Sequence, residues 1–600
     1  MKKLEEKLND TRNKFIVRSL YLDNILLNDH SLCLLANCYH SCSRCSRHCH
    51  RQYGRPSETC KLFQDSDIIN SDICSQDEIG RRLKFIEKTL GHRVVPQAKY
   101  DSKEQKKREC HEETREGVLD EIKQWTDTYS DTENCWWITG KPGVGKSTIG
   151  AKVAETLEDE KSLYAQYFVT RNIAATTDLE NILPTMAQQL AENSLFAALA
   201  IQDKLEKTPL SNVKKFSDCQ AQALLLEPLR AISQYSRKVV VVIDGIDELA
   251  NTEPSILSKV TSILCCIMSD LPANVKFLIF SRPEQWITAK IPPHINRLNL
   301  TTENSGYDVY LLVHAKLREL AEVHEWNDWP SEVQVSRLCQ LAAGHLGLAA
   351  TALRWIARQI EYEGSARRDE VLEEVSQLGT GEIDELYALI LRRILPLQDP
   401  ARKRYLKGLK TVLGCLVVLQ EPLDIGSIST LLSLDDFDVP HCMKRISSLI
   451  VDGTEPPTER TVPQVHKSVV DYLVSRRADS DFRIDPTEQH HSLTTTCFKS
   501  IWRLTFNIGH ITSSHGIYED ISISQDITYP CQWLGRHLEN GGERVTLVRD
   551  VDKFMKTRFL RWLEVLSLQY VVESVAISTL KILEKQIKVS IYLLTKHDYY

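Results

Sequence analysis

The sequence predicts a doubly wound α/β domain with a parallel sheet, followed by chain that is mostly helical. Between residues 135 and 290, apolar runs alternate with helical periodicity, as strands and helices do in a domain of this class. The run Val239–Ile243 is continuous and β-branched, which is typical of a parallel strand buried on both faces. From residue 300 onward the apolar spacing is mostly helical. Ligands of such sheets bind at the carboxyl ends of the strands, so polar residues there carry the functional prediction.

The bulk composition predicts a chain of several globular domains. Its 600 residues are 42% hydrophobic and 26% charged, and at ~150 residues per domain they suggest about four domains. The net charge of −7 gives no basic footprint, so nucleic acid is not expected as the main ligand. We expect no membrane span, because no long uncharged apolar stretch occurs. The charged start is unlike a signal peptide, and the scattered cysteines suit reduced thiols, so we expect a cytoplasmic protein.

The most informative stretch follows the first predicted strand, Cys135–Thr139. It has the spacing G-x-x-x-x-G-K-[ST] between a strand and a helix start, which is the context of a phosphate-binding loop. Glycines let backbone amides converge on phosphate oxygens, and the helix start adds unpaired N–H groups. Lys146 would reach the β- and γ-phosphates, and Ser147 would ligate Mg²⁺. The predicted nucleotide-binding residues of this loop are Gly140, Lys141, Pro142, Gly143, Val144, Gly145, Lys146, Ser147 and Thr148.

Charged residues follow two later strands. Asp244 directly follows the apolar run Val239–Ile243 and is predicted to hold Mg²⁺ through its water shell. Asp247 and Glu248 come shortly after it, and one of them would orient the attacking water as a general base. Arg282 follows a further strand and would pair with the γ-phosphate. The alternatives are an acidic helix start for the carboxylates and a surface ion pair for the arginine.

Together these elements resemble the NACHT domain of the STAND class of signalling NTPases. The nearest match is to fungal NACHT proteins related to heterokaryon incompatibility and to NOD-like receptors. Gly245 after the metal aspartate, with acids at 247 and 248, is that group's form of the second motif. The resemblance covers roughly residues 85–580. Further matching segments are Ala98–Ser102, Thr114–Trp125, Pro184–Leu190, Ile383–Leu391, Val465–Leu473, Tyr529–Trp533 and Trp562–Ser567.

The chain is expected to divide into six parts. A winged-helix-like domain is predicted because two short extended segments, Pro422–Ile425 and Val462–Val465, interrupt a helical region. The expected parts are a cysteine-rich region at 1–80, a helical segment preceding the NACHT domain at 81–133, the NACHT domain at 134–298, a helical domain at 299–378, the winged-helix-like domain at 379–478 and a C-terminal helical domain at 479–600.

The resemblance implies a nucleotide switch. ADP or GDP would hold the winged-helix domain against the NACHT domain, and the triphosphate would open the chain and allow self-association. His466 matches the histidine that touches the β-phosphate in such proteins; the alternative is a histidine of the helical core. Thr114 and Arg115 match the segment that packs near the base. Signalling in fungal non-self recognition is the implied role, with no residue identifying the trigger or the downstream effector.

Some features depart from the family's pattern. Gly347 stands where many relatives have a proline that packs on the base, so the choice between ATP and GTP stays open. Fungal relatives often continue into a repeat sensor, so we expect this chain either to lack it or to be truncated. Cys42 and Cys45 have zinc-ligand spacing, but the second pair is missing and zinc is not expected there. The alternative function is a nucleotide-binding interaction protein or decoy regulator with little turnover.

Overall fold

The computed structural model describes residues 80–597 except 103–113, 130–133, 172, 208–215, 250–253, 293–294, 302–304, 397, 399, 435–436, 451–461, 464, 511–522 and 543–547. The cysteine-rich start, with its predicted lack of zinc, lies outside the described residues. None of the helices in the described ranges is long and apolar enough to cross a membrane.

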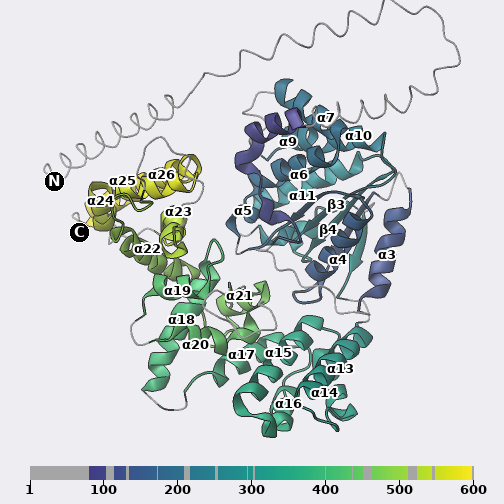
Figure 1. Ribbon diagram of the computed structural model, residues 1–600, viewed down its shortest axis with the longest axis vertical. Coiled ribbons are helices and arrows are strands. Elements are labelled where there is room, and N and C mark those ends of the chain that lie inside the picture. The colour runs from purple at the N-terminus through teal and green to yellow at the C-terminus, as the bar shows by residue number, and fades with distance from the viewer. Residues whose placement is uncertain are drawn as a thin grey trace, which may run out of the picture. The chain divides into compact units, whose positions relative to one another are not determined.

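Within the described residues, five parallel strands form one sheet in the order β2-β3-β4-β1-β5 (Figure 1). The sequence predicts the first four strands from the apolar runs Cys135–Thr139, Leu163–Val169, Val239–Ile243 and Lys276–Phe280. It does not predict β5, an edge strand of four residues that pairs with β1 alone and has a single apolar residue, Leu298. The strands are β1 Cys135–Thr139, β2 Leu163–Phe168, β3 Val239–Asp244, β4 Val275–Ser281 and β5 Asn296–Asn299.

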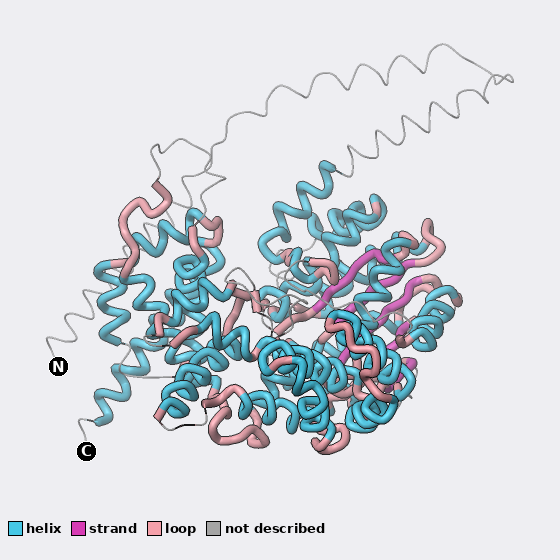
Figure 2. Tube along the Cα trace, turned by 60° about the horizontal axis from the view of Figure 1, so that its bottom comes forward, coloured by secondary structure: helices cyan, strands magenta, loops and turns pink. Residues whose placement is uncertain are grey.

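Helices cover both faces of the sheet, as predicted (Figure 2). Successive side chains of a strand point to opposite faces, so Val239 and Val241 belong to one apolar cluster and Val240 to the other. One cluster packs the strands against α3 Glu116–Asp127 and α4 Lys146–Asp159. The other includes a helix at 80–90 together with α6 Leu179–Asn193, α7 Leu195–Lys207, α10 Glu227–Ser233 and α11 Pro254–Ser269. Shorter helices are α5 Ala174–Thr177, α9 Asp218–Ala221 and α12 Gln285–Thr288.

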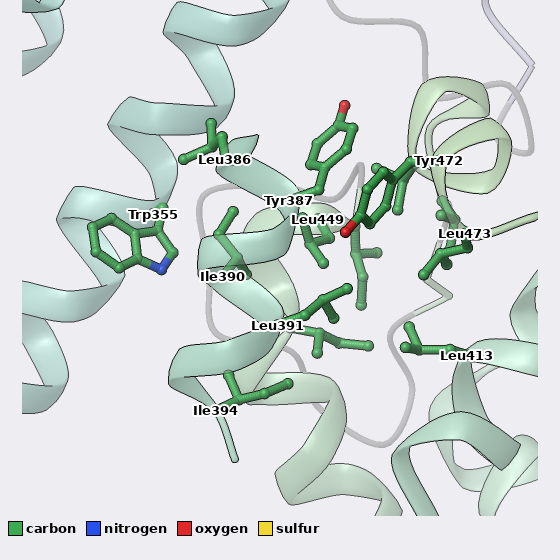
Figure 3. Close-up of a cluster of buried hydrophobic side chains, with 14 of the residues drawn as sticks. Trp355, Leu386, Tyr387, Ile390, Leu391, Ile394, Leu413, Leu449, Tyr472 and Leu473 are labelled. Carbon is green, nitrogen blue, oxygen red and sulfur yellow. The ribbon is translucent and has the colours of Figure 1, made fainter. Parts of the chain in front are cut away.

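The helices after the sheet share a single apolar core that runs from Val309 to Ile484 and also includes Leu493 and Tyr529. Figure 3 shows part of it: Trp355 of α15 (Leu346–Glu363) lies on one side of α17 (Ile383–Arg393), which carries Ile390, and Leu473 of α21 (Lys467–Val474) lies on the other. The segments 299–378 and 379–478 therefore pack as one continuous body. Its helices are α13 Gly306–Val323, α14 Glu332–Ala342, α15 Leu346–Glu363, α16 Arg368–Ser376, α17 Ile383–Arg393, α18 Ala401–Val418, α19 Ile425–Leu432, α20 Val439–Arg445 and α21 Lys467–Val474.

The winged-helix assignment stays a prediction. Pro422–Asp424 is extended chain between α18 and α19. Ile450 and Val465 form an antiparallel bridge immediately before α21, as the base of a small hairpin would. The residues between them at 451–461 lie outside the described ranges.

A chain of buried hydrogen bonds connects the sheet domain to the C-terminal helices. Ala174 N–H at the start of α5 donates to the Gln420 carbonyl at 2.8 Å, and Gln420 N–H donates to Tyr529 Oη at 3.1 Å. Tyr529 Oη lies 2.8 Å from His537 Nε2, and His537 Nδ1 lies 2.9 Å from His490 Nδ1. These bonds hold the chain after β2 in place beside the site. The C-terminal helices are α22 Pro486–Trp502, α23 Gln525–Asn540, α24 Val548–Thr557, α25 Phe559–Leu568 and α26 Val572–His597.

Candidate nucleotide-binding site

The loop between β1 and α4 has the backbone conformation that its glycines allow. Gly143 has a φ of 79° and Gly145 a φ of 95°, both in the left-handed region where other residues are strained. Gly145 is the N-cap of α4, so the loop leads directly into the N-terminus of a helix of 14 residues. Unpaired backbone N–H groups at such a helix start favour an anion.

Lys146 is half-buried in this loop. Its ammonium donates to the carbonyls of Gly140 at 2.7 Å and Lys141 at 2.9 Å. Burial lowers the pKa of Lys146 to about 8, although Asp247 acts in the opposite direction. The ammonium therefore lies at the centre of the loop, where phosphate oxygens would be stronger acceptors than the carbonyls.

A cavity of about 530 Å³ opens over the loop and brings together most of the predicted site. Its volume is in the range of small-molecule and cofactor sites. Gly140, Lys141 and Val144 belong to the loop without lining the cavity. The predicted residues that line it are Thr114, Arg115, Pro142, Gly143, Gly145, Lys146, Ser147, Thr148, Asp244, Asp247, Glu248, Arg282 and His466.

The groups present suit Mg²⁺. Asp244 is the buried last residue of β3 and lines the cavity together with Ser147. A hydroxyl and a carboxylate are oxygen ligands that Mg²⁺ accepts beside phosphates and water. Gly245 follows with a φ of 81°, and this turn carries the chain from β3 toward Asp247.

Asp247 is already engaged by cations. Its Oδ2 lies 2.6 Å from Lys467 Nζ and 3.3 Å from Arg282 Nε, and its Oδ1 accepts the Arg282 N–H at 3.0 Å. Burial alone would raise the pKa of this carboxyl, but Lys467, Lys146 and Arg282 together hold it below its usual range. A carboxylate with a lowered pKa is a weak base, so the predicted role of Asp247 as general base does not fit this conformation.

The other two predicted catalytic residues also have partners. Glu248 Oε2 accepts the backbone N–H of Arg171 at 3.2 Å, which fixes the chain leaving β2. Arg282 Nη1 lies 2.5 Å from Asp471 Oδ2 in α21. The surface ion pair considered as the alternative for Arg282 is therefore a half-buried pair that connects β4 to α21.

His466 is the N-cap of α21. Its Nδ1 accepts the Ser468 N–H at 3.2 Å and lies 2.6 Å from Ser468 Oγ, which in turn lies 2.7 Å from Tyr387 Oη. Because Nδ1 is an acceptor, a neutral His466 ring carries its proton on Nε2. This tautomer is the one that a phosphate acceptor in the cavity would require.

Arg115 braces the phosphate loop. Its guanidinium donates to the Val144 carbonyl at 2.8 Å and its Nε lies 3.6 Å from Asp308 Oδ2 in α13. Arg115 also has a φ of 62°, and its own N–H donates to Asp308 at 3.1 Å. These contacts add a structural role to the predicted one near the base.

The N-terminus of α15 packs directly against the phosphate-binding loop. The sequence does not predict this contact. Gly347 N–H donates to the Gly143 carbonyl at 2.8 Å. The His345 ring covers Gly143, and its Nδ1 caps α15 by accepting the Leu348 N–H at 3.1 Å. Burial lowers the pKa of His345, so the ring is neutral at pH 7. Gly347, singled out as a departure from the family, thus allows the backbone of α15 to reach the loop.

Gly347→Ala is expected to weaken nucleotide binding about tenfold. A β-carbon at this position would lie 2.7 Å from the Gly143 carbonyl oxygen, so either α15 or the loop must move. A displacement of phosphate-binding groups by about 1 Å has large effects on a positioned ligand. The measurement is calorimetric affinity, with Gly117→Ala in α3 as control, where no atom lies within 4 Å of the added carbon and the helical backbone accepts alanine. Equal affinities of Gly347→Ala and the parent would contradict this account.

Sequence reasoning missed three charged residues of the site. Lys467 and Asp471 are four residues apart in α21, and Arg171 follows β2. The i,i+4 spacing of Lys467 and Asp471 places them on one helix face, and this spacing could have been recognised in the sequence. Their partners were not, because each pair joins residues more than 180 positions apart.

A family model described as Nephrocystin 3, N-terminal, matches residues 113–282, from the segment before β1 to the arginine after β4. The vegetative incompatibility protein HET-E-1 of Podospora anserina is 21% identical over 500 residues, which is 75% of this chain. The chain spans 34% of the length of that relative.

Solved structures give weaker likenesses. Domain III of the replication initiation protein DnaA from Thermotoga maritima has a TM-score of 0.26 and 10% identity, over 48% of this chain and 99% of that one. The Walker-type ATPase of Pyrococcus abyssi has a TM-score of 0.28 and 12% identity, over 60% and 96%. These scores decide nothing about function. The family model and the fungal relative support the resemblance that the motifs predict: the chain is similar to the NACHT-domain STAND NTPases of the fungal incompatibility type.

Proposed function

We propose that this protein is a purine-nucleotide-dependent switch whose bound nucleotide sets the contact between α21 and the sheet domain. The observation that carries the proposal is the shared cavity. Lys146, Ser147 and Asp244 line it from the sheet domain, and His466 and Lys467 line it from α21. A ligand in this cavity touches both bodies, so its exchange can change their affinity for each other.

In this proposal ADP or GDP holds the closed form, and the triphosphate favours an open form that self-associates. The loop amides and Lys146 bind the phosphates, and His466 donates from Nε2. Ser147 and Asp244 would hold Mg²⁺, which when bound neutralises phosphate charge. Signalling in fungal non-self recognition is the proposed role, by analogy with the incompatibility relative.

A second candidate function is nucleotide binding with little turnover. The ion pairs of Asp247 with Lys467 and Arg282 favour it. These cations lower the pKa of the Asp247 carboxyl, and a carboxylate with a lowered pKa is a weak base for activating water. Slow hydrolysis then requires that α21 withdraws first. Both candidates share the same nucleotide site.

The experiment that tests the proposal is thermal unfolding of the purified protein with ADP, ATP, GDP or GTP and Mg²⁺. A ligand that binds only the folded form raises the midpoint according to RT ln(1 + [L]/Kd). We expect a clear rise with one purine. If heat extraction also releases no bound nucleotide, the absence of a shift with all four would refute the proposed function.

Nucleotide affinity is expected to fall above about pH 8. Burial holds the pKa of Lys146 near 8 in the ligand-free protein, although Asp247 opposes that shift. Phosphate favours the charged ammonium, so below this pH affinity is constant, and above it affinity falls by up to about tenfold per pH unit. Calorimetry between pH 7 and 9.5 measures this. Lys146→Arg stays charged throughout and serves as the control. Parallel profiles for the two proteins would exclude Lys146 as the titrating group.

A further inference from the structure

One carboxylate of α21 pairs with two arginines from different strand ends. Asp471 Oδ2 lies 2.5 Å from Arg282 Nη1, and its Oδ1 lies 3.6 Å from Arg171 Nη1. Arg282 follows β4 and Arg171 follows β2, the two strands that flank β3. Asp471 therefore lies across the carboxyl edge of the sheet, above the strand that ends in Asp244.

Both arginines belong to the nucleotide cavity. Arg171 and Arg282 line it, whereas Asp471 does not. Arg282 is also close enough to Lys146 to lower the pKa of that ammonium, although burial is the larger cause of the shift. The guanidinium groups thus lie where they can act on phosphates held by Lys146.

A guanidinium binds carboxylate and phosphate oxygens with the same planar set of N–H donors. Phosphate and Asp471 therefore compete for the same two arginines. A diphosphate, which ends at the loop, leaves the arginines to Asp471. A triphosphate adds a group of higher charge that can displace the carboxylate.

We propose that Asp471 is an internal substitute for the γ-phosphate and a determinant of diphosphate over triphosphate specificity. This inference rests on the proposed nucleotide switch. In the closed form, Asp471 neutralises Arg171 and Arg282 and holds α21 on the sheet domain. Triphosphate binding transfers the two arginines from Asp471 to the terminal phosphate, and α21 loses this contact.

The test is the ratio of triphosphate to diphosphate affinity in Asp471→Asn. Asparagine keeps the size of the side chain and removes its charge, and Asp471 is 32% exposed, so folding should be preserved. We expect triphosphate affinity to rise about tenfold, because the charged carboxylate no longer competes for the two arginines. Diphosphate affinity should change less than about threefold. Calorimetry with ATP, ADP, GTP and GDP measures both. Asp479→Asn removes the same charge from a residue that pairs with Arg392 outside the cavity and should leave the ratio unchanged.

A double-mutant cycle separates competition from a structural role. If Asp471 competes for Arg171, the gain of Asp471→Asn should shrink at least threefold in the Arg171→Gln background. Equal changes in triphosphate and diphosphate affinity, or a gain independent of Arg171, would overturn the inference. In either case the parent still binds nucleotide and the proposed switch stands. If the parent protein binds none of the four nucleotides, the proposed function itself is refuted.

Discussion

Replacing Lys146 by alanine is expected to abolish measurable nucleotide binding by the folded protein. The ammonium lies inside the loop and is held there by the carbonyls of Gly140 and Lys141. Its removal takes away the charge that faces the phosphates, and a charge-assisted contact of this kind is worth on the order of a hundredfold in affinity. Calorimetric titration with each purine nucleotide and Mg²⁺ measures the loss.

The matched control is Lys152→Ala in α4. Lys152 is exposed and pairs with Glu155 on the helix surface, so its loss removes one positive charge from the same helix without touching the cavity. This variant should bind as the parent does. Parental affinity in Lys146→Ala would show that the nucleotide, if any, binds elsewhere.

Lys467→Met is expected to release α21 from the sheet domain and raise spontaneous self-association. Lys467 Nζ lies 2.6 Å from Asp247 Oδ2 and also donates to the Asp247 carbonyl at 3.0 Å. Asp247 is only 4% exposed, and breaking one partner of a buried pair costs about 3 kcal/mol. The closed form alone bears that cost, so the equilibrium shifts toward the open form by about two orders of magnitude.

Light scattering after size exclusion, with diphosphate present, measures the effect. Lys403→Met, an exposed lysine of α18, is the control for the loss of one positive charge. Identical monomer fractions for Lys467→Met and the parent, with unchanged unfolding midpoints, would mean that the pair with Asp247 does not hold the closed form.

The sheet and the phosphate loop were predictable because both depend on local sequence. The β-branched run Val239–Ile243 is typical of a strand buried on both faces, and the glycines at 143 and 145 adopt positive φ values that their motif requires. β5 was not predicted, since an edge strand of four residues with one apolar residue, Leu298, has neither an apolar run nor a polar–apolar alternation.

The partners of the site residues were not predictable from local patterns. Arg282 and Asp247 follow strands whose carboxyl ends must meet at one sheet edge, so their proximity to Lys146 was foreseen. The ion pairs of Lys467 with Asp247 and of Asp471 with Arg282 were not foreseen, because they depend on how α21 packs against a sheet that is distant in the sequence. The ion pairs also change the chemistry expected of Asp247, from a general base to a residue held by cations.

The N-terminus of α15 illustrates the same limit. Gly347 was noted only as a missing proline, whereas its backbone contact with Gly143 depends on the packing of two segments some 200 residues apart. The function of a glycine at a close backbone approach becomes visible only when the partner is known.

Amide hydrogen exchange of the segment 467–474 measures whether the bound nucleotide sets the contact between α21 and the sheet domain. The backbone N–H groups of α21 report whether this helix is held on the sheet domain. With bound diphosphate we expect slow exchange, and with a non-hydrolysable triphosphate we expect exchange at least about tenfold faster in this segment, with exchange in the strands of the sheet unchanged. Equal protection of α21 in the two nucleotide states, with both nucleotides demonstrably bound, would contradict the proposed switch.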